Sequence, residues 1–505
     1  MKRLACLMAM ICAAFSAHAQ EAHVHIDSGD LVGVTRDRVE SFKGIPYAAP
    51  PVGTLRWRPP QAAQHWNKSL SAVDYGASCP QEMPVRRVPA GSAAERTSED
   101  CLTLNVWTPV EHSHPLPVMV WIHGGGNNNG TGSQTFYDGT AFARDGLVLV
   151  TLNYRLGMPG FFTHPALTRE AGKALNGNYG LQDQMAALQW VQRNAAAFGG
   201  DAKNVTVFGE SAGGEDILLL MTSPSAGKLF SKAIVESAGG WNGVRSLSDS
   251  EKQSAAFASA LGLQGDHATA AELRAVPVDS LSKVPDQEAL GPVVDGRLLP
   301  RAPVEVFAQG RALDIPLIIG TNGNEGSVLP EELKPGFALD GLSADAIDTA
   351  RKLYGASTTD DNAFAHSLFR DGFFATPARW AAARESEGAP SYLYHFTYVM
   401  SRLRARRAGA NHGSEIPFVF DTASTDRLSD ADRAVTNAVH SCWVAFAKTA
   451  TPVCTGAPAW PAYHRAEDSL LEFGDTIAVR TTPDRAVLDF LEQQLLPAAT
   501  IDRAR

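Results

Sequence analysis

A serine held between two glycines, where an apolar strand meets a helix, constrains this chain more than any other feature. The segment Gly209–Gly213 has the pattern G-x-S-x-G, follows the apolar run Val205–Phe208 and precedes a stretch compatible with a helix. Such a turn needs glycine on both sides, because a Cβ there would clash with the neighbouring strand and helix. The turn leaves the Oγ of Ser211 exposed above the sheet, near the N-terminal amides of the helix. The bare pattern also occurs as a structural turn, but this context favours a nucleophile on an α/β sheet.

Apolar runs along the rest of the chain predict a parallel sheet covered on both faces. They lack the alternation of half-exposed strands, as expected for buried parallel strands. Between two of them, Leu181–Phe198 has apolar residues every three or four positions, which indicates an amphipathic helix. Strands that alternate with helices predict a doubly wound α/β fold. The predicted strands are Val118–Ile122, Leu147–Tyr154, Val205–Phe208, Ala233–Glu236, Ile315–Gly320 and Tyr392–Tyr398.

The region from about 245 to 390 has mainly helical patterns, and we expect it to be an insertion that caps the sheet and its site. No clean boundary divides the rest, so residues 20–505 are predicted to form a single domain. With 44% hydrophobic and 19% charged residues, the chain has the composition of an ordinary globular protein. Its formal net charge of −10 argues against a general role on nucleic acid.

Residues 1–19 are predicted to be a secretory signal peptide. Two basic residues near the start precede the apolar run Leu4–Ala17, and residues 17–19 (A-H-A) form a small-x-small cleavage site. A membrane anchor is the alternative, but the run is shorter than the ~20 apolar residues that a span requires. We therefore expect export to the periplasm or out of the cell, a mature start near Gln20, and no stable membrane insertion.

Four cysteines follow residue 19, and an exported protein is expected to pair them. The sequence allows three pairings, of which the nearest-neighbour pairs Cys79–Cys101 and Cys442–Cys454 are the simplest. Buried free thiols are the alternative. No C-x-x-C motif or Cys/His cluster indicates zinc, and nothing in the sequence implies another metal or an organic cofactor.

A glycine triplet lies at the end of one predicted strand upstream of the serine. Gly124–Gly126 closely follows the run Val118–Ile122. Successive glycines let backbone N–H groups converge on one point, as the stabilisation of an oxyanion requires. With the N–H of Ala212, Gly125 and Gly126 would supply three donors. Glycine runs also mark ordinary loops, but a strand, this triplet and then G-x-S-x-G is the order expected of esterases and lipases.

With these motifs the chain resembles the type-B carboxylesterase family, which includes cholinesterases and broad-specificity bacterial esterases. The resemblance covers the chain nearly end to end, and it implies an α/β-hydrolase fold and hydrolysis of carboxylic esters. In this family the cysteine of the segment Glu99–Val106 pairs with an upstream cysteine, which supports Cys79–Cys101, whereas Cys442–Cys454 matches no family pair. The matching segments are Phe42–Ala48, Glu99–Val106, Trp121–Gly126, Asn153–Gly157, Gly180–Gln184, Ala196–Asp201 and Val205–Gly214.

The chain order serine, acid, histidine assigns two further candidates. Glu325 follows the predicted strand Ile315–Gly320 and resembles the family's acid, with Asn-Glu-Gly where Asp-Glu-Gly is usual. Asp295 is the competitor, although its surroundings resemble a structural turn of the family. His412 stands in a segment that resembles the family's catalytic-histidine loop. Four other histidines follow Glu325 without such a context: His366, His395, His440 and His464.

The resemblance gives each candidate a role. Ser211 would be the nucleophile, His412 the base that takes its proton, and Glu325 the acid that orients the imidazole. Glu210 and Ser237 resemble supporting positions that lie beside the nucleophile in cholinesterases.

Three departures from the family pattern bear on the substrate. Asn127, Asn128 and Asn129 follow the glycine triplet where an aromatic residue is common, so we expect a more polar acyl side, or else a solvated loop. The run Arg402–Arg407 contains four arginines before His412 and is expected at the rim of the site, as an attraction for anionic esters or as a solvated face. The sequence gives no account of two acids that follow the serine turn, Glu215 and Asp216.

The sequence thus predicts a serine carboxylesterase that forms an acyl-enzyme on small-molecule esters with short, polar or anionic groups. A lipase acting on longer chains has the same triad and is the nearest alternative. An inactive binding member of the family would normally lack a triad residue. The choice between monomer and homodimer stays open.

Overall fold

A large central sheet organises the protein. The computed structural model describes residues 20–496 except 82–84, 86, 285–289, 333–338, 340, 356–359, 386–387 and 424–427. Within these residues the sheet has thirteen strands. Their order is β1 (Gln20–Ile26), β2 (Gly29–Arg36), β3 (Val39–Pro46), β5 (Thr103–Pro109), β7 (Val148–Leu152), β6 (Leu116–Ile122), β8 (Gly200–Glu210), β9 (Lys232–Glu236), β12 (Leu317–Asn322), β13 (Ser391–Phe396), β14 (Ser469–Phe473) and β15 (Ile477–Thr481), with β4 (Leu70–Ser71) paired to β2.

The six runs predicted as buried strands are consecutive neighbours in this sheet. They form β7, β6, β8, β9, β12 and β13, and every pairing among them is parallel. Strands β1, β2, β3, β5 and β15 add antiparallel pairs at the two ends, whereas β4 pairs with β2 and β14 with β13 in parallel. All seven residues of β6 are buried, which explains why its sequence is apolar without alternation. The predicted large, mostly parallel sheet is therefore confirmed.

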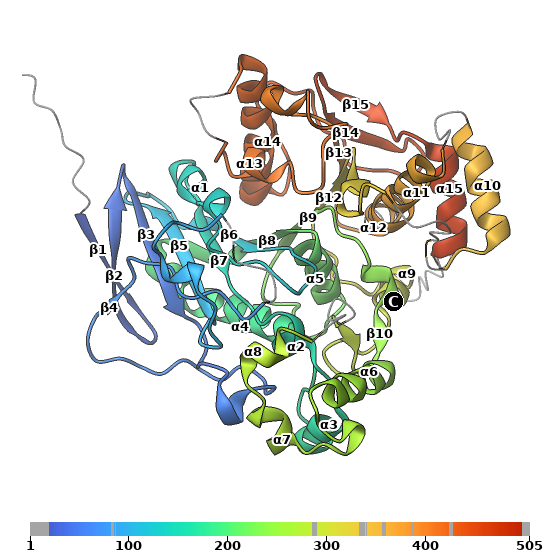
Figure 1. The fold of residues 1–505 in the computed structure, drawn as a ribbon. Coiled ribbons are helices and arrows are strands. Elements are labelled where there is room, and N and C mark those ends of the chain that lie inside the picture. Colours follow the sequence, from blue (N-terminus) through green and yellow to red (C-terminus); the bar gives the residue numbers. More distant parts are fainter. Residues whose placement is uncertain are drawn as a thin grey trace, which may run out of the picture.

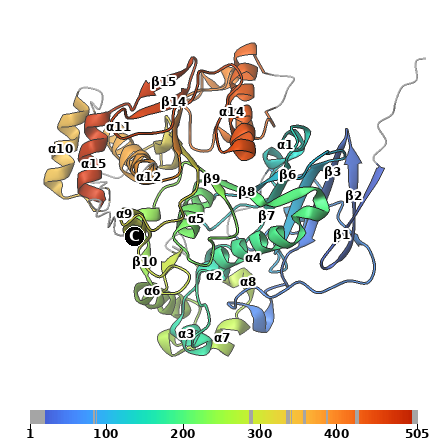
Figure 2. The ribbon, with the colours of Figure 1, turned by 180° about the vertical axis from the view of Figure 1, so that it is seen from behind.

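Helices cover both faces of the sheet. Successive residues of β6 point to opposite sides: Val118 and Val120 pack in one core with α4 (Tyr179–Asn194), α5 (Ala212–Met221) and α12 (Thr376–Glu385). Met119 and Trp121 pack in the other core with α1 (Thr140–Arg144) and α14 (Asp430–Thr449). Figures 1 and 2 show α4 and α5 on one side of the central strands and α1 and α14 on the other. The amphipathic helix predicted at 181–198 is α4 with the short turn that follows it.

The helical region predicted between about 245 and 390 is divided in two by β12, whose six residues are all buried in the sheet. Most helices of the first group lie apart from those of the second in Figure 1. The first contains α6 (Leu247–Ala260), α7 (Ala270–Ala275), α8 (Val278–Leu281) and α9 (Pro303–Ala308), next to the short strands β10 (Arg245–Ser246) and β11 (Val293–Val294). The second contains α10 (Ala344–Tyr354), α11 (Asp361–Phe369) and α12. The remaining helices are α2 (Gly157–Phe161), α3 (Pro165–Ala171), α13 (Ile416–Val419) and α15 (Arg485–Leu495).

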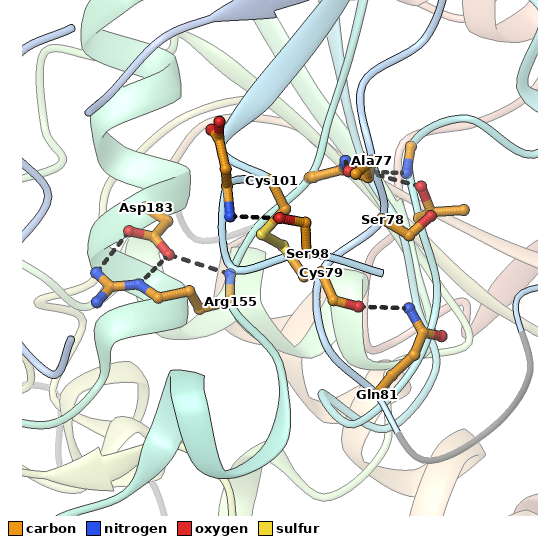
Figure 3. Close-up of a disulfide and its surroundings, with 12 residues drawn as sticks. Ala77, Ser78, Cys79, Gln81, Ser98, Cys101, Arg155 and Asp183 are labelled. Atoms are coloured by element: carbon orange, nitrogen blue, oxygen red, sulfur yellow. Dashed lines mark hydrogen bonds and ion pairs between the residues drawn. A yellow bond between two sulfur atoms is a disulfide. The ribbon is translucent and has the colours of Figure 1, made fainter. Parts of the chain in front are cut away.

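Two disulfides join the nearest-neighbour cysteines. Cys79 and Cys101, with Cα atoms 5.1 Å apart, connect a loop to the start of β5 (Figure 3). Cys442 and Cys454, with Cα atoms 4.4 Å apart, connect α14 to the loop after it. In the same view as the first disulfide, Arg155 and Asp183 of α4 form a buried ion pair, with Nε and Oδ2 2.7 Å apart (Figure 3). This pair joins two of the segments that carry the family resemblance.

Candidate active site

Ser211 stands at a strained turn between β8 and α5. Its φ of 56° and ψ of −126° are rare for a residue with a side chain. The flanking glycines leave no room for a Cβ: at Gly209 it would lie 2.6 Å from the carbonyl oxygen of Ile122, and at Gly213 it would collide with the same oxygen. The predicted reason for both glycines is therefore borne out by the packing, since the turn is pressed against the end of β6.

The glycine triplet lies directly on this turn. A Cβ on Gly124 would lie 2.8 Å from the Cβ of Ser211, so only glycine allows the loop to approach so closely. Gly125 and Gly126 have φ angles of 112° and 61°, in the region that favours glycine. Their N–H groups have no hydrogen-bond acceptor among the described residues. Ala212 is the first residue of α5 and directly follows the serine, and Gly125 and Gly126 line the same cavity as Ser211.

Glu325 and His412 meet at hydrogen-bond distance. Glu325 follows β12, is fully buried and accepts a hydrogen bond from the N–H of Asn322 at 2.6 Å. Its other carboxylate oxygen lies 2.6 Å from Nδ1 of the His412 ring. The backbone N–H of His412 donates to Oγ of Ser327 at 3.0 Å. These contacts set the orientation of the imidazole ring, so Nδ1 faces Glu325 and Nε2 faces the opposite way.

On that opposite side, Nε2 of His412 lies 3.1 Å from Oε1 of Glu210. In the described part of the chain, no hydrogen bond joins Oγ of Ser211 to His412. Burial raises the pKa of Glu210 to about 7, against the attraction of His412. Burial alone would lower the pKa of His412, but the carboxylates of Glu210 and Glu325 raise it to about 10. The histidine is therefore held between two carboxyl groups, with the serine beside them.

The competing candidates have other contacts. Oδ1 of Asp295 accepts hydrogen bonds from the N–H groups of Arg297 and Leu299, both at 2.9 Å, and so closes a turn. His366 contacts two backbone carbonyl oxygens, and His440 contacts Asp145 and a backbone carbonyl. None of these contacts involves Ser211 or Glu325. His412 is the histidine that the structure brings to Glu325.

The two predicted supporting residues differ in what they touch. Glu210 is the last residue of β8 and contacts His412 directly. Ser237 follows β9, is fully buried, and donates its N–H to the carbonyl oxygen of Gly320 at 2.9 Å. Its Oγ has no hydrogen-bond partner within the described chain. Only Glu210 therefore meets the candidate triad directly.

A cavity of about 540 Å³ opens over the serine. One wall is aromatic, and the other is formed by the glycine loop and polar side chains. No lysine or arginine belongs to the described lining. The lining residues are Pro80, Gln81, Gly125, Gly126, Asn128, Asn129, Leu156, Gly157, Pro159, Glu210, Ser211, Ser282, Val328, Phe369, Phe373, Phe374 and His412.

The sequence missed the aromatic wall. Phe369 ends α11, and Phe373 and Phe374 lie in the π-helical turn Arg370–Ala375 that follows it. The ring of Phe374 lies 5.2 Å from that of His412, measured between centroids. A π-turn breaks the periodicity of an α-helix, so spacing gave no sign that these rings face the site. The cluster of four phenylalanines in residues 364–374 was the available signal.

The three asparagines after the glycine triplet make two kinds of contact. Asn128 and Asn129 line the cavity, but their Nδ2 atoms donate to the carbonyl oxygens of Gly126 and Gly125, at 2.7 and 3.0 Å. Asn127 is buried outside this lining, and its Nδ2 donates to Oδ1 of Asp216 at 3.0 Å. The side-chain NH₂ groups expected to face an acyl group thus bond to the protein itself.

The contact of Asn127 with Asp216 also explains an acid that sequence reasoning left unexplained. Asp216 is fully buried, accepts from Asn127 and Gln184, and has its pKa raised to about 7 by burial. Its neighbour Glu215 lines a second, smaller pocket with Asn127. Asn127 and Asp216 therefore depart from the family pattern together, as a bonded pair.

The arginine run does not lie at the rim of this cavity. Arg404 pairs with Asp475, at 2.5 Å between Nη2 and Oδ1, and lines a different pocket with Arg407. Nε of Arg402 donates to Sδ of Met400 at 3.0 Å. The expected rim position is wrong for Arg404, because its ion pair with Asp475 holds it against the loop after β14.

A family profile described as the carboxylesterase family matches residues 20–491. The chain belongs to the carboxylesterase family. It is 36% identical over 487 residues to the fumonisin B1 esterase of Sphingopyxis macrogoltabida, covering 90% of this chain and 86% of that protein. It is also 36% identical over 485 residues to the para-nitrobenzyl esterase of Bacillus subtilis, covering 90% and 95%. The predicted family resemblance is thus confirmed.

Solved structures agree with this assignment. A para-nitrobenzyl esterase structure superimposes with a TM-score of 0.79 at 34% identity, covering 93% of this chain and 99% of the other. This carboxylesterase therefore has the predicted α/β-hydrolase fold and is a carboxylic ester hydrolase. Within the described residues, no helix is long and apolar enough to cross a membrane. No group of three metal-ligating side chains occurs there either.

Proposed function

We propose that this carboxylesterase acts through an acyl-enzyme formed on Ser211. The observation that carries the proposal is one shared cavity. Ser211 lines it at the strained turn, and His412, bonded to Glu325 at 2.6 Å, lines it beside the serine. If Nδ1 carries the proton that faces Glu325, the neutral imidazole accepts a proton at Nε2.

Catalysis then proceeds in two halves. Oγ of Ser211 bonds to the ester carbonyl carbon while its proton moves to Nε2 of His412, which first exchanges its contact with Glu210 for the serine. The N–H groups of Gly125, Gly126 and Ala212 bind the oxyanion. Collapse breaks the bond to the alkoxy oxygen, which takes the proton from His412 and leaves as the alcohol. Water then attacks the carbonyl carbon of the acyl-enzyme in the same way, with His412 as the base. Breaking the bond to Oγ of Ser211 returns the proton to the serine and releases the carboxylic acid.

We expect the substrates to be esters of small molecules with short or polar groups. Its volume of about 540 Å³ lies within the range of small-molecule sites. Three bacterial relatives are named for single compounds: fumonisin B1, para-nitrobenzyl esters and phenmedipham. An anionic substrate gains no support from the cavity, because its described lining has no lysine or arginine. A lipase remains the alternative, and an acyl series from acetate to palmitate that peaks at palmitate would favour it.

We also propose that the protein is exported and cleaved near Gln20. The family match begins at residue 20, and two disulfides suit an oxidising compartment. The intact mass of the exported protein should correspond to a start near Gln20 and four oxidised cysteines. A retained Met1 would contradict the cleavage.

The triad is tested by substitution, with the competing acid as control. Ser211→Ala and His412→Ala should each lower kcat for ethyl butyrate by ~10⁴-fold or more, and the double variant should lose little more. Glu325→Gln should cost less, because the imidazole keeps its proton-accepting nitrogen. Asp295→Asn retains the oxygen that closes its turn and should keep full activity. Full activity in purified Ser211→Ala would exclude the proposal.

A further inference from the structure

The carbonyl groups of the glycine triplet are all held by neighbouring groups. Nδ1 of His123 donates to the carbonyl oxygen of Gly124 at 2.8 Å. Nδ2 of Asn129 donates to that of Gly125 at 3.0 Å, and the N–H groups of residues 128 and 129 contact the same oxygen at 3.1 Å. Nδ2 of Asn128 donates to that of Gly126 at 2.7 Å. The orientation of each peptide group is therefore set from its carbonyl side.

In a trans peptide group, fixing the direction of the C=O also fixes the direction of the N–H. The C=O of one residue and the N–H of the next point in opposite directions across a trans peptide bond, and the described chain has no cis bond. Fixing the carbonyl of Gly125 therefore points the N–H of Gly126 away from Asn129. Glycine has no Cβ to resist rotation of this peptide group, so its direction depends on the three hydrogen bonds that the carbonyl of Gly125 accepts.

We propose that Asn129 is a positioning residue, which holds the Gly125–Gly126 peptide so that the N–H of Gly126 faces the oxyanion. The inference rests on the proposed function, in which that N–H is an oxyanion donor. It replaces the expectation that the amide of Asn129 contacts the acyl group. Asn129 acts on the transition state through the backbone, without touching the reacting atoms.

Asn128 provides a matched comparison. It is the same residue type, lines the same cavity and also donates to a carbonyl of the triplet. The carbonyl it holds belongs to Gly126, so it orients the N–H of Asn127, which is not one of the proposed donors. A role in substrate polarity would make the two asparagines equivalent, whereas a role in positioning makes Asn129 the more important for kcat.

The first experiment compares Asn129→Ala, Asn129→Asp, Asn128→Ala and Asn128→Asp with ethyl butyrate as substrate. Loss of an oxyanion donor costs about 10²–10³-fold in kcat. Because two backbone N–H groups still hold the carbonyl of Gly125, we expect a fall of about tenfold for Asn129→Ala. Asn129→Asp keeps the shape of the side chain but places a carboxylate oxygen against that carbonyl. Its kcat should therefore fall at least as far as that of Asn129→Ala. KM should change little, and the Asn128 variants should lose several-fold less kcat.

The second experiment measures inhibition by a trifluoromethyl ketone, which forms a reversible hemiketal oxyanion with the serine. Its inhibition constant should rise in Asn129→Ala by about the same factor as kcat/KM falls, because both report binding of the oxyanion. Melting temperatures of all variants establish that they fold. Equal losses of kcat at positions 128 and 129, or an unchanged inhibition constant in Asn129→Ala, would overturn the inference. Failure of the proposed function would look different, since the wild-type enzyme would then resist the ketone.

Discussion

His412 lies between two buried carboxyl groups, and this position determines how the site should respond to pH. Glu325 contacts Nδ1 at 2.6 Å and Glu210 contacts Nε2 at 3.1 Å. Both carboxylates favour the imidazolium and raise the pKa of His412. The proposed mechanism requires the neutral imidazole, so activity should rise with pH as His412 loses its proton.

Glu210→Gln tests this arrangement. The substitution removes a negative charge beside Nε2, so it should lower the pKa of His412 and move the acid limb of kcat/KM to lower pH. Glu415→Gln should move the limb less in the same direction, because Glu415 is the weakest of the carboxylates that raise this pKa. The measurement is the pH profile of kcat/KM for ethyl butyrate. An acid limb that stays in place, or moves upward, in Glu210→Gln would contradict the electrostatic account.

At the scale of secondary-structure elements, the site depends on how closely β6, β8 and α5 approach one another. Gly213 belongs to the first turn of α5 and touches the last residue of β6. Gly243 is a matched control, because a Cβ there would meet nothing within 4 Å.

Gly213→Ala should therefore lower the free energy of unfolding by about 2 kcal/mol or more, through overpacking against the backbone. Gly243→Ala should leave it within about 0.5 kcal/mol of wild type, as expected of a substitution in open space. Urea denaturation of the two variants provides the measurement. A Gly213→Ala protein as stable as wild type would contradict the packing described here.

The elements that the sequence predicted well are those whose environment is uniform. The buried parallel strands are apolar throughout, so their runs were visible and all six lie in the sheet. Several end strands were missed because they are half exposed; β1, for example, buries only Ala22 and Ile26. Strand β5 is mostly buried, but Asn105 and Thr108 interrupt its apolar run. The helical region was expected to be one insertion, although the strand predicted at Ile315–Gly320 lies inside it and forms β12, which divides it in two.

The site was predicted unevenly for a similar reason. Motifs with strict backbone demands identified Ser211 and the glycine loop, and the resemblance identified Glu325 and His412. The direction of a side chain depends on its contacts, which spacing does not record. Arg404 therefore faces Asp475 and Asn127 faces Asp216, whereas the sequence left open whether each faces the substrate or solvent.

At the scale of the whole molecule, the two disulfides should stabilise the fold to a similar extent but differ in their effect on catalysis. They span 22 and 12 residues, and loops of these sizes contribute about 3 kcal/mol each by constraining the unfolded chain. Only Cys79 adjoins the cavity lining, through Pro80 and Gln81.

Paired serine substitutions separate the two effects. Cys79→Ser with Cys101→Ser should lower both the melting temperature and kcat/KM, because the wall carrying Pro80 and Gln81 loses its anchor. Cys442→Ser with Cys454→Ser should lower the melting temperature by a similar amount and leave kcat/KM at 25 °C nearly unchanged. Calorimetry and steady-state kinetics measure the two quantities. Equal losses of activity in both variants would contradict the structural assignment of the first disulfide.

The central claim is that Ser211 is the nucleophile of the whole enzyme, and covalent trapping tests it most directly. The enzyme is treated with a fluorophosphonate, which phosphonylates an activated serine, and the site and stoichiometry of the adduct are determined by mass spectrometry of the digested protein. The account predicts one adduct per chain, on Ser211, formed in proportion to the loss of ester hydrolysis and absent from His412→Ala. Complete inactivation with Ser211 unmodified, or full activity with Ser211 phosphonylated, would contradict it.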